Sequence, residues 1–414
     1  MDNNADIDVQ DLPAERRPLR IALVTETYPP EVNGVSMTLA RIVDCLHQRG
    51  HDLQLIRPRQ KNEAATEPRL HEVLLRGLPI PRYPNLRMGV PSKRALVRLW
   101  STHRPDVVHI ATEGPLGWSA LQAARHLQLP VTSDFRTNFH AYSAHYGIGW
   151  LHKPIMAYLR KFHNQCQSTM VPTNALRADL ENAGFQRLVV VSRGVDTQGF
   201  SPELRSAELR ASWGVADDDL VVACVGRLAA EKNLHQVLTS FEAIRQQHPR
   251  ARLLLVGEGP LRAELLTRCP DAIFAGQRRG VDLAAHYASA DLFVFASLTE
   301  TFGNVTAEAL ASGLPVLAYR HAGAALLIQD GENGRLAQPA DSIGFTQIAL
   351  QLAADVEQRR RLAQAARRSM QAHTWDAIGA RFEAELMRAT GRPEAGSTQI
   401  STLEPSSTMR LVGR

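Results

Sequence analysis

The sequence predicts an α/β protein made of two Rossmann-like domains in tandem, each built on a doubly wound parallel sheet. Short apolar runs alternate with helix-length amphipathic segments through most of the chain, which is typical of parallel α/β sheets. At 414 residues the chain is too long for one ordinary hydrophobic core. We therefore expect one domain over residues 19–199 and a second over residues 200–374. Ligands of such folds bind at the carboxyl ends of the strands, which here would face an interdomain cleft.

The first half begins with a predicted strand, LRIALVTE at 19–26, that leads into a proline-rich loop containing Gly34. A helix is predicted from about residue 36 to residue 48, and either Asn33 or Ser36 could cap its start. Further strands of this half are predicted at 52–58, 106–112, 130–135, 168–173 and 189–196.

The polar stretch over residues 200–219 is interpreted as the linker between the domains. A second alternation then predicts strands at 220–227, 252–259, 272–276, 293–297 and 316–319. A final helix at 375–390 is expected to return toward the first domain. We expect residues 1–18 to be flexible and residues 391–414, which are rich in Gly, Ser, Thr and Pro, to form a disordered tail.

Composition excludes several classes of protein. The chain is 44% hydrophobic and 21% charged with a net charge of +5, which is ordinary for a globular protein and gives no indication of nucleic-acid binding. No apolar run approaches the ~18–20 residues of a membrane-spanning helix. The N-terminus is acidic and polar and lacks the apolar core of a secretion signal. We therefore expect a cytoplasmic protein, either soluble or peripheral on the inner membrane face, with its scattered cysteines reduced.

Residues 293–319 carry the most informative pattern: an apolar strand, a loop, a helix from about Asn304 to Ala311, and a second strand. This order places Glu300 in the loop and Glu308 on the helix. The first amides of a helix lack partners and its N-terminal end is electropositive, so the segment 302–305 could hold a phosphate. The two carboxylates could accept hydrogen bonds from hydroxyl groups on either side. A sugar, a diphosphate and a ribose present that order of groups, so we predict a nucleotide-sugar site.

Residues at other predicted strand ends add to this site. Arg227 ends the first strand of the second domain, and Lys232 follows just before the next predicted helix. A guanidinium and an ammonium group both stay charged at neutral pH and suit a diphosphate, although either could be an ordinary solvated charge. Gly34 could let the backbone approach a phosphate closely. Gln277 follows the 272–276 strand, where a nucleotide base could bind.

Several segments resemble the retaining glycosyltransferases of family 4, within which bacterial mannosyltransferases and plant-type sulfoquinovosyl-diacylglycerol synthases are the most similar. The matching segments span most of residues 19–390 and are TETYPPEVNGVSMTLARIV, VPTNALRADL, SRGVDTQGF, VGRLAAEKNL, LLLVGEGPLRAELL and ETFGNVTAEALASGLPVLA. The resemblance implies the GT-B fold, with two Rossmann-like domains facing a cleft. It also implies transfer of a sugar from a nucleotide donor with retention of anomeric configuration.

The resemblance assigns expected roles to the predicted site residues. Arg227 and Lys232 would neutralise the leaving diphosphate in the place that a metal holds in other transferases, so no metal and no other cofactor is expected. Glu300 would bind hydroxyls of the donor sugar, and Glu308 those of the ribose. Backbone amides would complete the diphosphate cradle by preorganised charge stabilisation; they belong to Gly34, Gly303, Asn304, Val305 and Thr306.

One segment departs from the family pattern. Relatives often carry a histidine-threonine pair after the fourth or fifth strand of the first domain, and here Arg136 stands where that histidine would be. A guanidinium cannot serve as a base, but it could bind an anionic sugar or a phosphate. Either Arg136 or the nearby His140 could take the role of the family histidine. The donor therefore stays open between GDP-mannose and a UDP-sugar.

The acceptor side is expected in the first domain. Residues 92–104, SKRALVRLWSTHR, would form a helix whose cations lie beside apolar residues, and residues 150–163 repeat this composition. Such a helix could dock on an anionic membrane and so serve a lipid acceptor such as diacylglycerol. Alternatively, both segments are ordinary amphipathic helices that pack an apolar face on the sheet.

Three alternatives to a lipid-modifying transferase are open at this point. The same transfer could use a soluble or polysaccharide acceptor. The chain could be a non-catalytic nucleotide-sugar-binding protein, although the charged residues of the predicted site are all present. A nucleotide-sugar epimerase would need further acid–base carboxylates and histidines, for which the sequence has no clear constellation.

Overall fold

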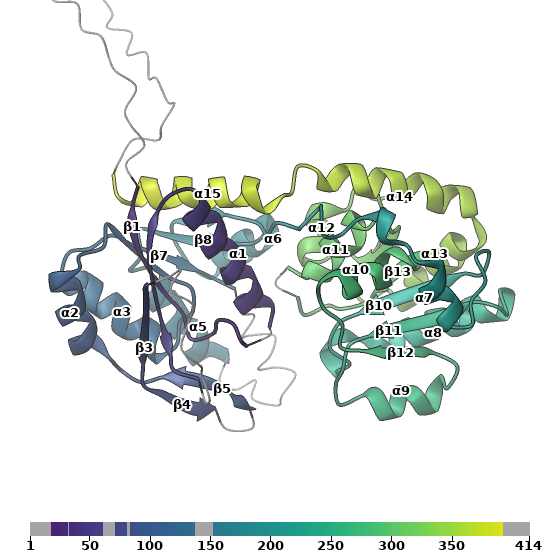
Figure 1. Cartoon of the computed structure of the whole chain (residues 1–414), viewed down its shortest axis with the longest axis horizontal. Helices are drawn as coiled ribbons and strands as arrows, with labels where there is room; N and C mark the ends of the chain where they lie inside the picture. Colours follow the sequence, from purple (N-terminus) through teal and green to yellow (C-terminus); the bar gives the residue numbers. More distant parts are fainter. Residues whose placement is uncertain are drawn as a thin grey trace, which may run out of the picture.

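A computed structural model describes residues 18–31, 33–60, 71–80, 83–136, 152–300 and 302–391. The chain folds into two α/β domains that lie side by side (Figure 1), each with its own parallel sheet. The predicted pair of Rossmann-like parallel sheets is confirmed.

The N-terminal sheet has the strand order β3-β2-β1-β6-β7-β8-β9, and its described pairs are parallel. The order reverses between β1 and β6, so the switch point that binds ligands in such folds lies at the ends of these two strands. The strands are β1 (Arg20–Val24), β2 (Asp52–Pro58), β3 (His71–Leu75), β6 (Val107–Ile110), β7 (Val131–Asp134), β8 (Ser168–Val171) and β9 (Leu188–Val190). The helices are α1 (Gly34–Gln48), α2 (Lys93–Thr102), α3 (Pro115–His126), α5 (His152–His163) and α6 (Asn174–Asn182).

The C-terminal sheet has the order β12-β11-β10-β13-β14-β15, with its switch point between β10 and β13. Its strands are β10 (Val221–Val225), β11 (Arg252–Val256), β12 (Ile273–Gly276), β13 (Leu292–Phe295), β14 (Val316–Tyr319) and β15 (Arg335–Ala337). Its helices are α7 (Ala207–Ser212), α8 (Leu234–Gln247), α9 (Arg262–Arg268), α10 (Gly280–Ala288), α11 (Asn304–Ala311), α12 (Ala322–Leu327), α13 (Ser342–Ala354) and α14 (Val356–Met370).

The continuous apolar strands are explained by burial on both faces of each sheet. In β10, Val221, Ala223 and Val225 enter one hydrophobic cluster, whereas Val222 and Cys224 enter the cluster on the opposite face. Successive side chains of a strand point to opposite faces, so a sheet covered by helices on both sides needs apolar residues at every position.

Helix α1 begins two residues earlier than the predicted start at residue 36. The Asn33 side chain accepts hydrogen bonds from the backbone N–H of Val35 and Ser36, at 3.1 and 2.9 Å. This cap satisfies donors that the first turn of a helix leaves free. Ser36, the other candidate cap, instead donates its hydroxyl to the Glu31 carbonyl at 2.6 Å.

The segment 200–219 was predicted as a linker, and this is wrong in part. It contains a 3-10 turn, Pro202–Leu204, and helix α7. Its charged residues suggested exposure, but Arg210 is only 1% exposed and donates to Asp291 and to backbone carbonyls, including that of Ala216. A buried charged side chain with such hydrogen-bond partners contributes to the folded core, as a buried apolar side chain does. Strands β3 and β15, and the antiparallel hairpin of β4 (Gly77–Ile80) and β5 (Tyr83–Gly89), were also not predicted.

The last described helix, α15 (Trp375–Ala389), returns to the N-terminal domain (Figure 1). Its buried residues Ile378, Phe382 and Leu386 join the hydrophobic cluster that contains Leu39 and Ile42 of α1. The N-terminal domain is therefore completed by a segment that follows the whole C-terminal domain in the sequence. Among the described residues, no helix is long and apolar enough to span a membrane.

Candidate active site at the domain junction

Glu300 and Lys232 meet at the carboxyl edge of the C-terminal sheet. Lys232 ends a 3-10 turn after β10, Glu300 lies in the loop after β13, and the Lys232 ammonium group contacts the Glu300 carboxylate. Ser297 also donates its hydroxyl to Glu300, at 2.9 Å. The two charged side chains are 20% and 16% exposed, so solvent reaches both. The structure thus brings together the cation that was predicted to bind the diphosphate and the carboxylate that was predicted to bind sugar hydroxyls.

Arg227 lies one residue beyond Gly226 at the end of β10, but it is not part of the same ion pair. Its side chain is 48% exposed, and its guanidinium lies 3.3 Å from the carboxylate of Glu231, whose side chain is 6% exposed. The pairing with Glu231 leaves much of the Arg227 side chain open to solvent. Arg227 and Lys232 lie on the same loop.

The N-terminus of α11 offers open backbone donors. Gly303 precedes the helix with a left-handed φ of 84°, and no side chain caps the helix. Within the described part of the chain, the N–H groups of Asn304 and Val305 donate no hydrogen bond. The N–H of Thr306 donates to the Gly303 carbonyl at 3.1 Å, so this amide is not available as predicted.

Glu308 lies on α11 and is partly buried. Burial raises the pKa of its carboxyl to about 6, while a hydrogen bond from the Tyr287 hydroxyl, at 2.9 Å, acts in the opposite direction. Tyr287 is fully buried on α10. Near neutral pH the carboxylate is therefore ionised, oriented by Tyr287 and able to accept hydrogen bonds from hydroxyl groups.

Two elements of the N-terminal domain meet the start of α11. Gly34 begins α1, and a side chain at this position would place its Cβ 3.7 Å from Nη1 of Arg193. The same Nη1 donates to the Asn304 side-chain carbonyl at 3.0 Å, which joins the two domains. The predicted phosphate-binding segments around Gly34 and Asn304 thus lie on either side of one buried arginine.

Arg136 follows β7 and is 7% exposed. It contacts the carboxylate of Asp134, which also lies 3.2 Å from His109 Nε2. Burial raises the pKa of Asp134, but the opposing charges of Arg136 and His109 hold it below its usual value. His140, the other candidate for the family histidine, lies outside the described residues.

Gln277 follows β12 at the edge of the C-terminal sheet and is exposed. In the part of the chain that the structure describes, no hydrogen bond or ion pair links Gln277 to Lys232 or to either glutamate. The proposed role of Gln277 in binding the nucleotide base stays a prediction.

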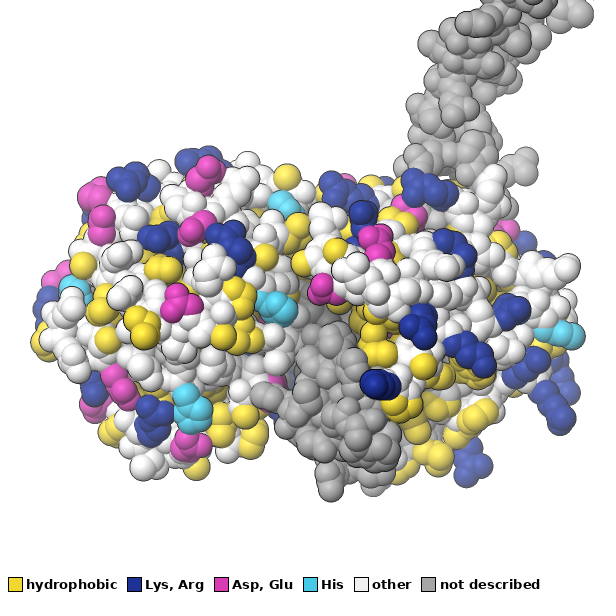
Figure 2. Space-filling view, turned by 180° about the vertical axis from the view of Figure 1, so that it is seen from behind, with side chains coloured by type: hydrophobic (Ala, Val, Ile, Leu, Met, Phe, Trp, Pro, Cys, Tyr) yellow, Lys and Arg dark blue, Asp and Glu magenta, His cyan; other side chains and the backbone are white. Residues whose placement is uncertain are grey.

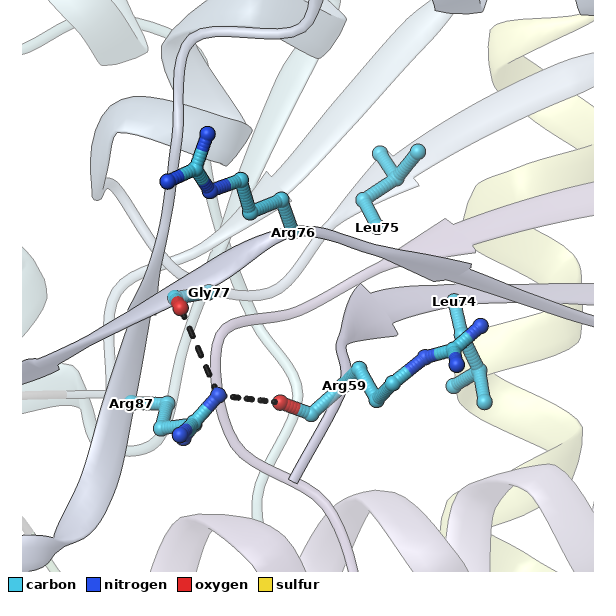
Figure 3. A pocket seen from close by; sticks show the side chains of 6 residues that line it. All are labelled: Arg59, Leu74, Leu75, Arg76, Gly77 and Arg87. Atoms are coloured by element: carbon cyan, nitrogen blue, oxygen red, sulfur yellow. Dashed lines mark hydrogen bonds between the residues drawn. The ribbon is translucent and has the colours of Figure 1, made fainter. Parts of the chain in front are cut away.

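A separate hollow of about 400 Å³ lies between β3 and the β4–β5 hairpin (Figure 3). Arg87 reaches across it and donates to the carbonyls of Arg59 and Gly77, both at 3.4 Å. Arg59, Arg76 and Arg87 form no ion pair with any described carboxylate. The hollow shares no residue with the predicted nucleotide-sugar site; it is a basic feature of the N-terminal domain.

Sequence reasoning missed three residues that contact predicted site residues: Arg193, Tyr287 and Ser297. Ser297 is the last residue of the predicted 293–297 strand, three positions before Glu300, so its contact with Glu300 could have been predicted from the sequence. Arg193 and Tyr287 gain their roles from contacts with residues 111 and 21 positions away, which no local pattern indicates. Among the described residues, no three His, Cys, Asp or Glu side chains are grouped as a metal site would require.

Two family models match the chain, one on each domain. Residues 32–198 match the model described as Glycosyltransferase Family 4. Residues 219–355 match the model described as Glycosyl transferases group 1.

Similar proteins of known function include three transferases. The chain is 35% identical to a GDP-mannose-dependent alpha-mannosyltransferase of Mycolicibacterium smegmatis, over 90% of this chain and 100% of that protein. It is 30% identical to a sulfoquinovosyl transferase of Arabidopsis thaliana, over 94% of this chain and 78% of the relative. It is 27% identical to an alpha-monoglucosyldiacylglycerol synthase of Streptococcus pneumoniae, over 77% and 75% of the two chains.

Solved structures confirm the predicted GT-B fold. HepE of Anabaena, solved with UDP and glucose, has a TM-score of 0.71 at 20% identity, over 89% of this chain and 100% of that chain. Sucrose-phosphate synthase of Thermosynechococcus elongatus has a TM-score of 0.73 at 19% identity, over 91% and 100%.

Proposed function

From the premise that the chain belongs to glycosyltransferase family 4, we propose that it transfers a hexosyl group from a nucleotide sugar to a lipid acceptor, with retention of anomeric configuration. The membership makes the chain a glycosyltransferase and sets aside the epimerase and non-catalytic alternatives. The observation that carries the proposal is the contact between Lys232 and Glu300 at the carboxyl edge of the C-terminal sheet.

In the proposed reaction, the bond between the anomeric carbon and the diphosphate breaks, and a bond from an acceptor hydroxyl oxygen forms. Negative charge grows on the departing diphosphate. Lys232, the exposed face of Arg227 and the open amides of Asn304 and Val305 would stabilise that charge, since preorganised donors act most strongly where charge develops. Glu300 would hold the sugar hydroxyls and Glu308 the ribose. No metal is required in this scheme, and we expect transfer to persist in the presence of EDTA.

We propose GDP-mannose as the first donor to test. This choice is supported by the name of the mannosyltransferase relative that the chain matches at 35% identity. A UDP-sugar is the alternative, supported by the UDP complex of HepE. Arg136 is weaker support for an acidic sugar than the sequence suggested, because its guanidinium contacts the Asp134 carboxylate.

The donor is tested by thermal shift and calorimetry with GDP, UDP and ADP, followed by an assay of sugar transfer. We expect one nucleotide to raise the melting temperature of the protein. Lys232→Ala should lose that binding and abolish transfer while the protein stays folded. Arg250→Ala is a matched control, since it removes an exposed basic side chain of the same domain that is paired with Asp218. Full transfer activity in Lys232→Ala would disprove the proposed site.

The proposed lipid acceptor is supported by the diacylglycerol named in the streptococcal relative and by the surface of the N-terminal domain. In α2, Lys93, Arg94 and Arg98 are exposed and form no ion pair with any described residue. However, Leu96 and Trp100 are fully buried against the domain. The apolar face of this helix therefore packs on the protein, as the alternative interpretation expected, and only its cations could meet a membrane.

Exposed apolar residues are instead found on the β4–β5 hairpin. Leu78 and Met88 are paired across the two strands and are 47% and 38% exposed. The arginines of the neighbouring hollow lie beside them. Figure 2 shows Lys and Arg side chains spread over the rear face of this domain among hydrophobic ones. Cations beside apolar side chains suit an anionic lipid surface.

Vesicle co-sedimentation tests the lipid acceptor. Replacing Lys93, Arg94 and Arg98 by Gln should weaken binding to anionic vesicles about a hundredfold, because each cation near the surface contributes about 1 kcal/mol. The matched control neutralises three exposed arginines of α14, Arg360, Arg361 and Arg368. If the wild-type protein does not bind anionic vesicles, a soluble or polysaccharide acceptor replaces the lipid in this proposal.

A further inference from the structure

Arg193 is a buried cation that the N-terminal domain presents to the C-terminal domain. It follows β9 and is 5% exposed, and its guanidinium lies 5.6 Å from the ring of Phe302. Nη1 donates to Asn304, whereas Nε has no hydrogen-bond partner among the described residues. No described carboxylate forms an ion pair with it. A buried guanidinium with one neutral acceptor and an unsatisfied N–H is costly unless a further acceptor binds it.

The surroundings of Arg193 favour an anion. The N-terminus of α11, with the open amides of Asn304 and Val305, is the electropositive end of that helix. Burial and, to a smaller extent, the nearby charge of Arg136 lower the pKa of Arg193 to about 9, against the opposite effect of Glu300 and Asp134. The group is therefore charged at neutral pH. Both nearby carboxylates are in contact with other cations, Asp134 with Arg136 and Glu300 with Lys232, and neither is paired with Arg193.

The backbone that carries Arg193 is held in place. A Cβ on the next residue, Gly194, would lie 2.7 Å from Cα of Trp375 at the start of α15. The N–H of Val195 donates to the His373 carbonyl at 2.9 Å. The guanidinium is thus presented from a backbone that is packed against the crossing to α15, so little reorganisation is needed when it binds a ligand.

We propose that Arg193 binds the donor diphosphate from the N-terminal side, as a third cation in addition to Arg227 and Lys232. The proposal rests on the function proposed above. A phosphate oxygen would accept from the free Nε–H and from Nη1, in place of or alongside the Asn304 side chain. Because Arg193 belongs to one domain and the α11 amides to the other, the bound diphosphate would bridge the domains, and nucleotide affinity would depend on both.

The test is calorimetric titration of GDP and UDP, with the tighter of the two as the probe. Arg193→Gln should weaken binding about tenfold to a hundredfold, the usual effect of losing a hydrogen bond to a charged group. Arg193→Lys keeps the charge but not the planar fork, so its loss should be smaller. Arg41→Gln is the matched control: it removes an N-terminal-domain arginine that pairs with Asp196 at 3.2 Å, and binding should not change.

A purely structural role of Arg193, as a strut between the domains, makes different predictions. In that case Arg193→Gln would lower the melting temperature and leave nucleotide affinity unchanged, which would overturn the inference. If Arg193→Gln does not fold, the melting temperature and nucleotide affinity of Arg193→Lys are compared with those of the wild type instead.

The two proposals fail separately. Loss of nucleotide binding in Lys232→Ala together with unchanged binding in Arg193→Gln would overturn the role of Arg193 alone. Unchanged binding in both variants would overturn the proposed donor site as well.

Discussion

The Glu308 carboxyl is the group whose charge changes most readily within the proposed site. Its pKa of about 6 lies above that of an ordinary glutamate because burial disfavours the ionised form. The folded protein therefore holds this proton more tightly than the unfolded chain does. The stability that follows from this is fully present below about pH 4.5 and is lost as the pH rises through 6.

Nucleotide binding should show the opposite dependence on pH. In the proposed site the ionised carboxylate would accept hydrogen bonds from the ribose hydroxyls, so affinity for GDP or UDP should fall about tenfold between pH 7 and pH 5 as the group takes up its proton. Calorimetric titration across this range measures the effect. Glu308→Gln is the control, because the phosphates of the nucleotide titrate equally in both proteins. Parallel pH profiles in the two proteins would contradict the prediction.

Residue-level prediction from sequence depends on local signals. Glu300 and Lys232 were predicted from a loop and a strand end, and the structure joins them in one contact. Arg193 could not be predicted in this way, because its position opposite Asn304 exists only after two domains have packed together. His140 stays a prediction.

Among the secondary-structure elements, α11 combines structural and functional demands most closely. Its bounds, Asn304–Ala311, are those expected from the sequence, since Gly303 before it and Gly313 after it both take left-handed φ values that favour glycine. The less predictable elements are those stabilised from a distance. Strand β3 is only half-buried at the sheet edge, and α7 depends on the buried contacts of Arg210.

Gly303→Ala should reduce stability and also damage the site. A non-glycine residue at a φ of 84° costs about 1–2 kcal/mol. In addition, the new Cβ would lie 3.3 Å from Cγ of Glu300 and 3.5 Å from the Phe295 ring, which would displace the carboxylate. We therefore expect transfer activity to fall at least about tenfold, with the free energy of unfolding measured by urea titration.

The matched control is Gly50→Ala at the end of α1. Gly50 has nearly the same φ, 85°, but a Cβ on this residue would meet no other atom within 4 Å. The variant should lose the same amount of stability and keep full activity. Equal activity losses in the two variants would mean that backbone strain, and not the position of Glu300, explains the effect.

At the scale of the whole molecule, α15 ties the end of the fold to its beginning. Glu383 on this helix is 5% exposed and lies 3.0 Å from Arg49 and 3.1 Å from His51. His51 Nδ1 accepts the N–H of Leu19 at 3.0 Å, so its other nitrogen donates to Glu383. The Glu383 carboxylate thus accepts hydrogen bonds from Arg49, just after α1, and from His51, just before β2.

Removing this carboxylate should loosen the attachment of α15. Glu383→Ala removes the buried acceptor of His51 and one of the two carboxylates that pair with Arg49, which keeps Asp376; this should cost about 2 kcal/mol of unfolding free energy. Urea unfolding of the N-terminal domain measures the loss. Glu385→Ala on the same helix is the control, because its partner Arg388 is 60% exposed and remains solvated. A similar loss in both variants would show that the cost comes from the helix and not from the buried pair.

The return of α15 also affects the order in which the two domains can fold during synthesis. On the ribosome an N-terminal domain normally folds before the next domain has emerged. Here the domain that is translated first lacks a wall of its hydrophobic interior until residue 389 has left the exit tunnel. The domain translated second has its full set of described strands by residue 337 and its last helix, α14, by residue 370. Its maturation can therefore precede that of its upstream neighbour.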